Sequence, residues 1–426
     1  MRSLRRRLSA ALSVTSIHKK ILPLTALLMP LTATGRSVVY DPQVKTLQVV
    51  VNQDWLSPPV MRLGSDDVLN IGFDELSHTF HRYIYRLEHC EADWSPSEDL
   101  FESNWLEGFN GNTIEDYENS LNTTVLYTHY WLQIPNDRCQ LKMSGNYRLH
   151  IYDEDDDDKE VLCAEFRVVE PLMKVGMSIT TNTDIDFNQS HQQVSMTVLY
   201  GSVNVNNVED QIRTVVMQNG REDNQILNVK PNYVRNDRLQ WEHNQALIFD
   251  AGNEYRKFEV LALSHPTMGI DRMRWDGTNY HAFPFVGGPR PSYILDHDAD
   301  GAFYVRNSDN IENDRTCDYV YVHYKMLAEN YRDDVIIDGN WTTEDGSNYV
   351  MTYDNSDHSY NATILQKQGY YSYQYLLRDA DGRTRYLPEE GSFFETENRY
   401  QAFVYYKGIS ERTWRLVGYQ QVILGR

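Results

Sequence analysis

The fold of this chain is indicated by residues 81–94, which read HRYIYRLEHCEADW. Aromatic and aliphatic residues alternate with charged ones through its first half. Period two over this length is typical of a β-strand with one buried face. The strand then enters a turn that holds a histidine, a thiol, two carboxylates and an indole within residues 89–94. This turn is a metal site, a nucleophile site or a structural corner.

The sequence on both sides of this stretch continues the strand pattern. We expect strands at residues 46–51, 68–73, 82–90, 124–134, 146–152 and 161–169, with Leu126, Tyr130, Leu132 and Ile134 on one face. Six strands over about 130 residues fit an immunoglobulin-like sandwich. The long excursion at 100–121 carries Trp105, Phe109 and Tyr117, so it is expected to pack back on the sheet.

The remaining chain reads as two further β units. The second has strands at 194–200, 212–217, 246–249 and 258–263, and the breaker cluster 287–291 precedes its end. The third has strands at 319–325, 349–353, 360–365 and 369–378, with 399–407 closing its sheet. No segment shows a sustained helical stripe. The prediction is an all-β chain of consecutive immunoglobulin-like and E-set-like β-sandwich domains at 36–170, 171–295 and 296–426.

Residues 1–35 have the pattern of an export signal. Six basic residues precede an apolar run at 21–34, and Ala33-Thr34-Gly35 offers a small-x-small cleavage site. The alternative is a membrane anchor, but the run contains Pro23 and Pro30 and is shorter than the roughly twenty residues of a span. We expect a signal peptide and therefore export.

The charge of the chain restricts its partners. The formal charge of −21 becomes about −27 once the six basic residues before residue 36 are removed. Duplex nucleic acid and anionic lipid are both bound mainly through cationic side chains, so neither is expected as a partner. The net negative charge suits a soluble protein, or one that binds a protein partner with basic patches.

Four cysteines are present, and an exported chain can keep disulfides. Cys90, Cys139 and Cys163 lie in the first unit and Cys317 in the third. Spacing alone does not choose a pair, and at most one pair forms within the first unit. No C-x-x-C motif and no Cys/His pairing at zinc spacing occurs, so a structural zinc is not expected.

Two acidic stretches resemble cation sites only superficially. Residues 153–158 lack the glycine and the spaced ligands of a calcium loop, so a solvated hairpin tip is expected. Residues 296–301 open like a calcium loop, but Asn307 stands where a bidentate Glu is needed. An Asp/Gly-rich β-turn is expected there.

No catalytic motif accounts for the reactive residue types at 88–94. The chain has no G-x-S-x-G elbow, H-E-x-x-H helix, Walker loop or dinucleotide fingerprint. His89 and His129 could meet around Cys90 at a metal site, but a buried hydrogen-bonded histidine and an inert buried thiol are the simpler interpretation. His89 and Cys90 point to opposite faces of a strand and do not form a dyad. We therefore predict no catalytic, cofactor-binding or metal-binding residues, no cofactor and no small-molecule substrate.

Ten stretches in order along the chain carry a family resemblance. They are residues 40–42, 73–76, 89–94, 108–109 with 114–117, 127–130, 134–136, 144–147, 251–256 with 258–259, 300–301 with 304–307, and 391–398. On these the chain resembles the plug protein of the type IX secretion system of Bacteroidetes. The third unit is also similar to E-set sandwiches that accompany glycan-active domains, through Trp341, Met351 and the Tyr-rich run 370–375.

The resemblance implies a non-enzymatic periplasmic β-domain protein. Such proteins seal the periplasmic side of the outer-membrane translocon barrel when no cargo passes, so the barrel is the expected partner and the periplasmic face of the outer membrane the expected location. The alternative is a periplasmic or secreted glycan-binding protein that uses Trp341 or Tyr371. A third possibility, a hydrolase, requires an open cleft with two converging carboxylates.

Overall fold

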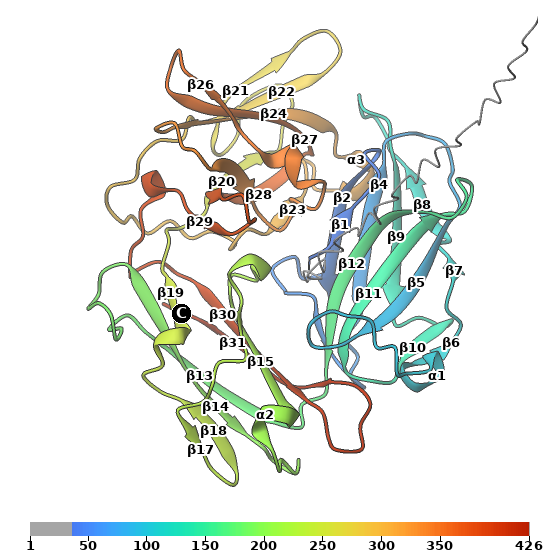
Figure 1. Cartoon of the computed structure of the whole chain (residues 1–426). Helices are drawn as coiled ribbons and strands as arrows, with labels where there is room; N and C mark the ends of the chain where they lie inside the picture. Colours follow the sequence, from blue (N-terminus) through green and yellow to red (C-terminus); the bar gives the residue numbers. More distant parts are fainter. Residues whose placement is uncertain (1–35, 426) are drawn as a thin grey trace, which may run out of the picture. The chain divides into compact units, whose positions relative to one another are not determined.

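A computed structural model describes residues 36–425, and the predicted signal peptide at 1–35 lies outside these residues. Its regular secondary structure is almost entirely β-strand, with three α-helices of four residues each, α1 (Glu102–Trp105), α2 (Val208–Gln211) and α3 (Asn313–Thr316). The all-β prediction is confirmed, and the strands assemble into three sandwiches (Figure 1). No helix in the described part of the chain is long and apolar enough to span a bilayer.

The first sandwich pairs a six-stranded sheet, β1-β12-β11-β5-β7 with β3 on β12, with a four-stranded sheet, β2-β4-β9-β8, and a small β10-β6 ladder lies beside them. Its strands are β1 (Val38–Val39), β2 (Val44–Val51), β3 (Val60–Arg62), β4 (Leu69–Glu75), β5 (Tyr83–Cys90), β6 (Leu106–Gly108), β7 (Asn112–Thr113), β8 (Asp116–Asn119), β9 (Thr128–Ile134), β10 (Cys139–Leu141), β11 (Gly145–Asp153) and β12 (Lys159–Val169). The alternating residues Tyr83, Tyr85 and Leu87 face its core.

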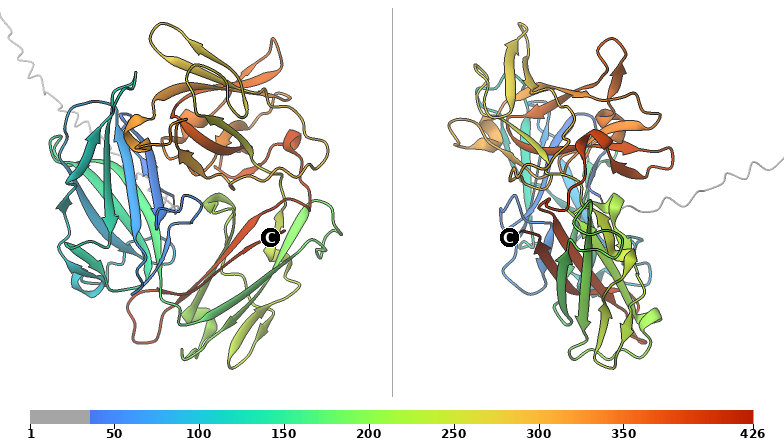
Figure 2. Two further views of the ribbon diagram at one scale, coloured as in Figure 1. Left: turned by 180° about the vertical axis from the view of Figure 1, so that it is seen from behind. Right: turned by 90° about the vertical axis from the view of Figure 1, so that its left-hand side faces the viewer.

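The second sandwich consists of the sheets β13-β14-β18-β17, with β19 on β14, and β16-β15-β30-β31. Its elements are β13 (Lys174–Thr180), β14 (His191–Leu199), β15 (Ile212–Gln218), η1 (Glu222–Asn224), β16 (Ile226–Leu227), β17 (Tyr233–Val234), β18 (Arg238–Trp241), η2 (Gln245–Leu247), β19 (Ile248–Asp250), β30 (Arg399–Tyr406) and β31 (Arg415–Ile423). Figures 1 and 2 show the two red strands from the end of the chain among the green strands of this sandwich.

The third sandwich has the sheets β20-β28-β23, with β25 and β29 on β28, and β21-β22-β24-β27-β26. Its elements are β20 (Arg256–Val260), β21 (Ile270–Trp275), β22 (Tyr280–Pro284), β23 (Phe303–Val305), β24 (Tyr319–Leu327), β25 (Asp334–Asp338), η3 (Gly346–Tyr349), β26 (Thr352–Asp354), β27 (Ser359–Lys367), β28 (Gly369–Arg378), β29 (Thr384–Tyr386) and η4 (Pro388–Glu390). It is inserted between β19 and β30 of the second sandwich.

The placement of residues 399–407 corrects one prediction. These residues were expected to close the sheet of the third unit, but β30 pairs with β15 over Ile212–Gln218 and with β31. Likewise β20 pairs with β28 and so joins the third sandwich, although residues 258–263 were assigned to the second unit. β30 finds its partner β15 on the other side of the inserted sandwich, and sequence order does not reveal that return.

The start of β9 corrects a second prediction. The expected strand 124–134 begins at Thr128, because the backbone N–H groups of Thr124 and Val125 donate to the Asp318 carboxylate instead of a neighbouring strand (2.7 and 3.1 Å). Leu126 is therefore exposed, whereas the other three residues of its predicted face are buried.

The excursion at 100–121 packs back less completely than expected. Trp105 is buried in the first core, but Phe109 is 76% exposed and Tyr117 is 43% exposed. The acidic tip is as predicted, since residues 154–158 form the exposed turn between β11 and β12. At 296–301 the predicted turn also forms: Ala302 N–H donates to Ala299 O across Asp300 and Gly301, which both have positive φ.

Candidate functional site

The turn at 88–94 is a corner that binds the second sandwich. His89 is buried, its Nε2–H donates to Ser144 O at 3.3 Å, and its Nδ1 accepts from the Ser97 hydroxyl at 2.8 Å. Burial lowers the pKa of His89, so it is held neutral. The Cys90 thiol points away from it, toward Glu88 at 3.7 Å. His129 lies elsewhere, on β9 against Asp74, so no metal site forms from these residues.

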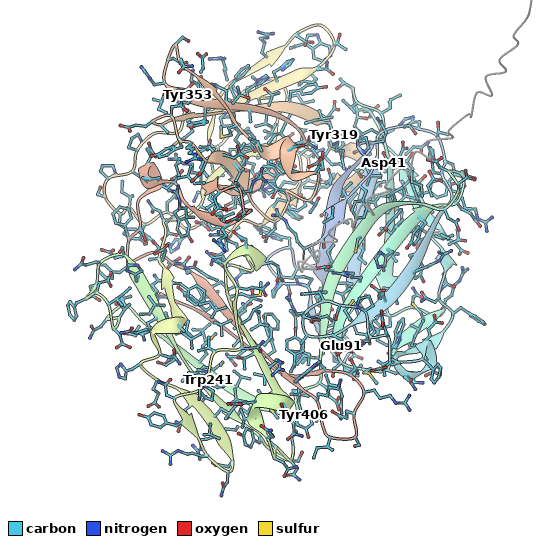
Figure 3. The ribbon with its side chains drawn as sticks, in the orientation of Figure 1. Asp41, Glu91, Trp241, Tyr319, Tyr353 and Tyr406 are labelled. Atoms are coloured by element: carbon cyan, nitrogen blue, oxygen red, sulfur yellow. The ribbon has the colours of Figure 1, made fainter. Side chains whose placement is uncertain are left out.

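Glu91 and Trp94 make the contacts of this corner with the second sandwich. The Glu91 carboxylate accepts from the Thr413 hydroxyl at 2.8 Å and from the Trp414 N–H at 3.0 Å, and both donors lie in the loop between β30 and β31. Trp94 is buried, with φ of 66°, and the Arg167 guanidinium lies 4.9 Å from its ring centroid. Figure 3 labels Glu91 at this junction. Of the three alternatives for this stretch, the contacts support the structural corner, and Trp94 packs at it.

Arg167 is the central cation of this first junction. Its guanidinium pairs with Glu222 of the second sandwich at 2.7 Å and lies 4.5 Å from the ring centroid of Phe403. Asn146 accepts from the Tyr405 hydroxyl at 2.7 Å. The ion pair of Arg167 and Glu222 lies beside an apolar cluster that the two sandwiches share. The cluster consists of Val169, Val215, Met217, Phe403, Tyr405 and Leu416. The first and second sandwiches therefore share a core of their own.

A second junction joins the first and third sandwiches through a buried ion pair. The Asp74 carboxylate on β4 accepts from Lys367 Nζ of β27 at 2.6 Å, with both side chains essentially inaccessible to solvent. The same carboxylate accepts from the Tyr319 hydroxyl at 2.6 Å and bonds His129 Nδ1 at 2.7 Å. Burial by itself would raise the pKa of Asp74, but Lys367 and His129 outweigh it and hold that pKa below its usual value. Tyr319 is labelled in Figure 3.

Lys367 has further partners at this second junction. It donates to the Asp314 carbonyl at 2.6 Å and lies 4.1 Å from the centroid of the Tyr127 ring. The Tyr127 hydroxyl in turn donates to the Cys317 carbonyl at 2.7 Å. A buried charge is tolerated when it is paired and hydrogen-bonded, and Lys367 has a carboxylate, a carbonyl and an aromatic ring as partners.

The third junction is formed by two of the stretches that carry the family resemblance, 251–256 and 391–398. The chain passes from the second sandwich to the third through the former and returns through the latter. Phe393 N–H and the Thr396 hydroxyl both donate to Gly252 O, at 2.8 and 2.9 Å. Asn398 donates to Ala251 O at 2.8 Å and to Gln192 Oε1 at 2.9 Å. These residues therefore bond the two crossing segments to one another and to the second sandwich.

A cavity of about 520 Å³ lies where the sandwiches meet. Among its lining groups Glu165 Oε2, Arg167 Nε, Glu222 Oε2 and Arg399 Nε are buried without a hydrogen-bond partner in the described part of the chain. Burial raises the pKa of Glu222 even though Arg167 opposes the shift. Apolar side chains line the cavity together with charged ones, among which Arg167 pairs with Glu222 and Arg221 pairs with Asp223.

The residues proposed for sugar stacking are not on the surface. Trp341 is 8% exposed and Tyr371 is 3% exposed, and both belong to the core of the third sandwich. The Trp341 indole N–H donates to Ser372 O at 3.0 Å. Neither ring presents a face to a sugar, so the E-set likeness at these positions reflects core packing.

Sequence reasoning missed one cluster, on the outer face of the six-stranded sheet. His150 of β11 bonds Glu160 of β12 (Nδ1 to Oε1, 2.6 Å), and the Cys163 thiol lies beside them. Burial opposes charge on the imidazole, but its bonds to Cys163, Glu160 and Glu88 outweigh burial and raise the pKa of His150. All four cysteines are buried and free.

Fold and contacts together define a multi-sandwich β-protein whose buried polar groups hold its sandwiches against one another. A family model described as type 9 secretion system plug protein 1st domain matches residues 44–170, which is the first sandwich. A crystal structure of a hypothetical protein from Parabacteroides merdae is 34% identical, with a TM-score of 0.88 over 92% of this chain and 99% of that one. The chain belongs to the type 9 secretion system plug protein family. This membership associates it with type IX secretion.

Other comparisons add nothing to this assignment. An alkylpurine DNA glycosylase from Pseudomonas fluorescens is 11% identical over 30% of each chain, with a TM-score of 0.16. The α-2-macroglobulin of E. coli is 10% identical over 91% of this chain and 23% of its own, with a TM-score of 0.18. Such scores carry no argument about fold or function. No curated protein matches the chain. The family model and the Parabacteroides structure indicate no enzyme family.

Proposed function

We propose that this chain is a non-enzymatic periplasmic plug that docks against the periplasmic face of the type IX translocon barrel and closes it when no cargo passes. Membership in the plug family carries the proposal. The export signal expected at 1–35 supports a periplasmic location, and the net negative charge suits a barrel rim with basic patches.

The junctions support the proposal mechanically. A plug has to keep one shape in order to close a pore to small solutes. Sandwiches joined by a flexible linker would move relative to one another. Here the first sandwich is held to the second by Glu91 and Arg167, and to the third by the buried pair of Asp74 and Lys367. The described residues, 36–425, accordingly belong to one compact unit. A body of this kind blocks a pore by bulk and needs no catalytic group.

Affinity capture from native membranes tests the docking. A tagged mature chain, residues 36–426, is expected to retain the translocon barrel in a stoichiometric complex, and capture is expected to weaken as salt screens the acidic surface. An unrelated exported β-sandwich of similar charge is the control. Absence of the barrel from the captured material at low salt, both with and without cargo-bound machinery, would remove the proposed partner.

Permeability of the outer membrane tests the sealing. Cells that keep the barrel but lack this chain are expected to admit hydrophilic antibiotics that are normally too large to cross, and a plasmid copy of the chain restores exclusion. Equal uptake with and without the chain contradicts a sealing role, even if docking is observed.

A further inference from the structure

The cluster of His150, Glu160 and Cys163 combines three different metal-binding groups on neighbouring strands. One ligand atom from each residue lies within 4.8 Å of the others. The Cys163 side chain is buried, whereas His150 and Glu160 are partly exposed, with side-chain exposures of 20% and 32%. The family assignment and the proposed plug role use none of these residues.

An irregularity of the β11–β12 ladder creates this arrangement. His150 pairs directly with Cys163, so both side chains project from the same, outer face of the sheet. The register then shifts: Ile151 pairs with Leu162, and Tyr152 pairs with Glu160. Val161 is the extra residue of this bulge and is buried. Without the bulge Glu160 would point into the core. A β-bulge that re-aims one side chain is a feature of functional sites.

The donor atoms suit a borderline divalent ion. A thiolate excludes calcium and magnesium, which take oxygen ligands, whereas zinc accepts sulfur, imidazole nitrogen and carboxylate oxygen together. Ligand atoms around a tetrahedral zinc are separated by about 3.3–3.8 Å, given bond lengths of 2.0–2.3 Å. The three ligand atoms lie within 4.8 Å of one another, and His150 Nδ1 and Glu160 Oε1 are 2.6 Å apart, so side-chain movements of about 1 Å bring them to the spacing of zinc ligands.

Glu88 completes the surroundings of the cluster from β5. Its Oε2 lies 3.6 Å from His150 Nε2, while His150 Nδ1 faces Glu160. A metal-bound histidine usually gives its second ring N–H to a carboxylate, which fixes the orientation of the ring. The neighbouring cation, Arg148, pairs with Glu165 through Nε at 2.8 Å. Its Nη1 lies farther from Glu88, 4.0 Å from Oε2.

We infer that His150, Glu160 and Cys163 form a zinc site with three protein ligands, with Glu88 positioning the histidine. The ligands are one imidazole, one carboxylate and one thiolate, and the partial exposure leaves the fourth coordination position to water. The ion links β11 to β12 on the outer face of the first sandwich, beside β1.

Zinc and cobalt titrations of the untagged mature chain test the site. Isothermal titration with Zn²⁺ is expected to show one equivalent bound, and Co²⁺ is expected to give a thiolate-to-metal charge-transfer band in the near ultraviolet. Cys163→Ser removes the band, and His150→Gln weakens Zn²⁺ binding at least tenfold. Cys139→Ser is the matched control, because Cys139 is a buried free thiol of the same sandwich outside the cluster.

The outcomes separate this site from adventitious binding and from misfolding. Thermal unfolding without metal is expected to be similar for the wild type, Cys163→Ser and Cys139→Ser, and added Zn²⁺ raises the melting temperature of all but Cys163→Ser. A cobalt complex without a thiolate band, or zinc binding that survives both cluster variants, overturns the inference. So does the absence of stoichiometric binding in the wild type.

Discussion

The buried pair of Asp74 and Lys367 permits a quantitative test of the second junction. Asp74→Asn keeps the shape of the side chain but leaves the Lys367 ammonium buried without a counter-ion, beside the Asp314 carbonyl and the rings of Tyr127 and Tyr319. Removing one member of a buried ion pair costs about 3–5 kcal/mol, because the remaining charge is uncompensated. Lys367→Met is expected to cost a similar amount, since it strands the carboxylate.

The double variant distinguishes this mechanism from simple loss of packing. When Asp74→Asn and Lys367→Met are combined, no uncompensated charge remains, so the total cost is expected to be well below the sum of the single costs. The matched control is the exposed pair of Lys325 and Asp357, where Lys325→Met is expected to cost about 1 kcal/mol or less.

Urea unfolding of the mature chain, followed by tryptophan fluorescence and by far-UV circular dichroism, supplies the free energies. Coincident transitions by both probes show that the sandwiches unfold together, as the junctions predict. Strictly additive single costs, or a cost of Asp74→Asn no larger than that of Lys325→Met, would refute the reasoning.

Three further predictions concern the junctions and the core. The pKa of His89 is lowered in the folded chain, so acidification below the unfolded pKa of about 6.5 protonates the unfolded state first and decreases stability. His89→Gln is therefore expected to make the unfolding free energy depend less on pH between about pH 7.5 and 5.5 than it does in the wild type. An unchanged pH dependence in the variant contradicts this. Arg167→Met strands Glu222 at the first junction and is expected to cost about 3–5 kcal/mol in urea unfolding, whereas a loss under 1 kcal/mol would show that the pair does not hold the sandwiches. Gly369→Ala would place its Cβ 2.3 Å from Tyr304 O and is expected to cost about 1–3 kcal/mol, whereas Gly288→Ala, with open space around it, is nearly neutral; equal effects of the two would count against the β23–β28 pairing.

Local strand structure was readable from the sequence because period two is visible in the residues themselves. The alternation of Tyr83, Tyr85 and Leu87 placed β5 and its buried face, and the acidic run at 153–158 marked the tip between β11 and β12. The division of the strands among sandwiches was not readable. β30 satisfies its ladder with β15, nearly two hundred residues earlier in the chain, and no local pattern encodes that distance.

The polar sites depended on register, which sequence gives only to within one residue. Counting back from the acidic tip would place His150 opposite Leu162 or Cys163, and these two side chains lie on opposite faces of the sheet. The bulge at Val161 decides between them, and nothing in the residue types announces it. Asp74 and Lys367 were likewise invisible as a pair, because they meet only when two sandwiches pack together.

The reactive residue types at 88–94 show that residue types alone do not identify a site. Histidine, thiol and carboxylate in one turn are typical of a catalytic or metal site, yet here they satisfy backbone and hydroxyl groups at a junction. Strand geometry correctly separated His89 from Cys90. The family resemblance was informative for a structural reason, since the stretches 251–256 and 391–398 are the crossing between two sandwiches.

Conductance of the purified translocon barrel in a planar lipid bilayer tests the central claim most directly. Addition of the folded mature chain to the periplasmic side is predicted to reduce the open-pore current in a saturable manner, and the same chain unfolded by heat is predicted to have no effect. A current that stays unchanged while the chain is shown to be bound would contradict the account, because the chain would then be a partner of the barrel and not its plug.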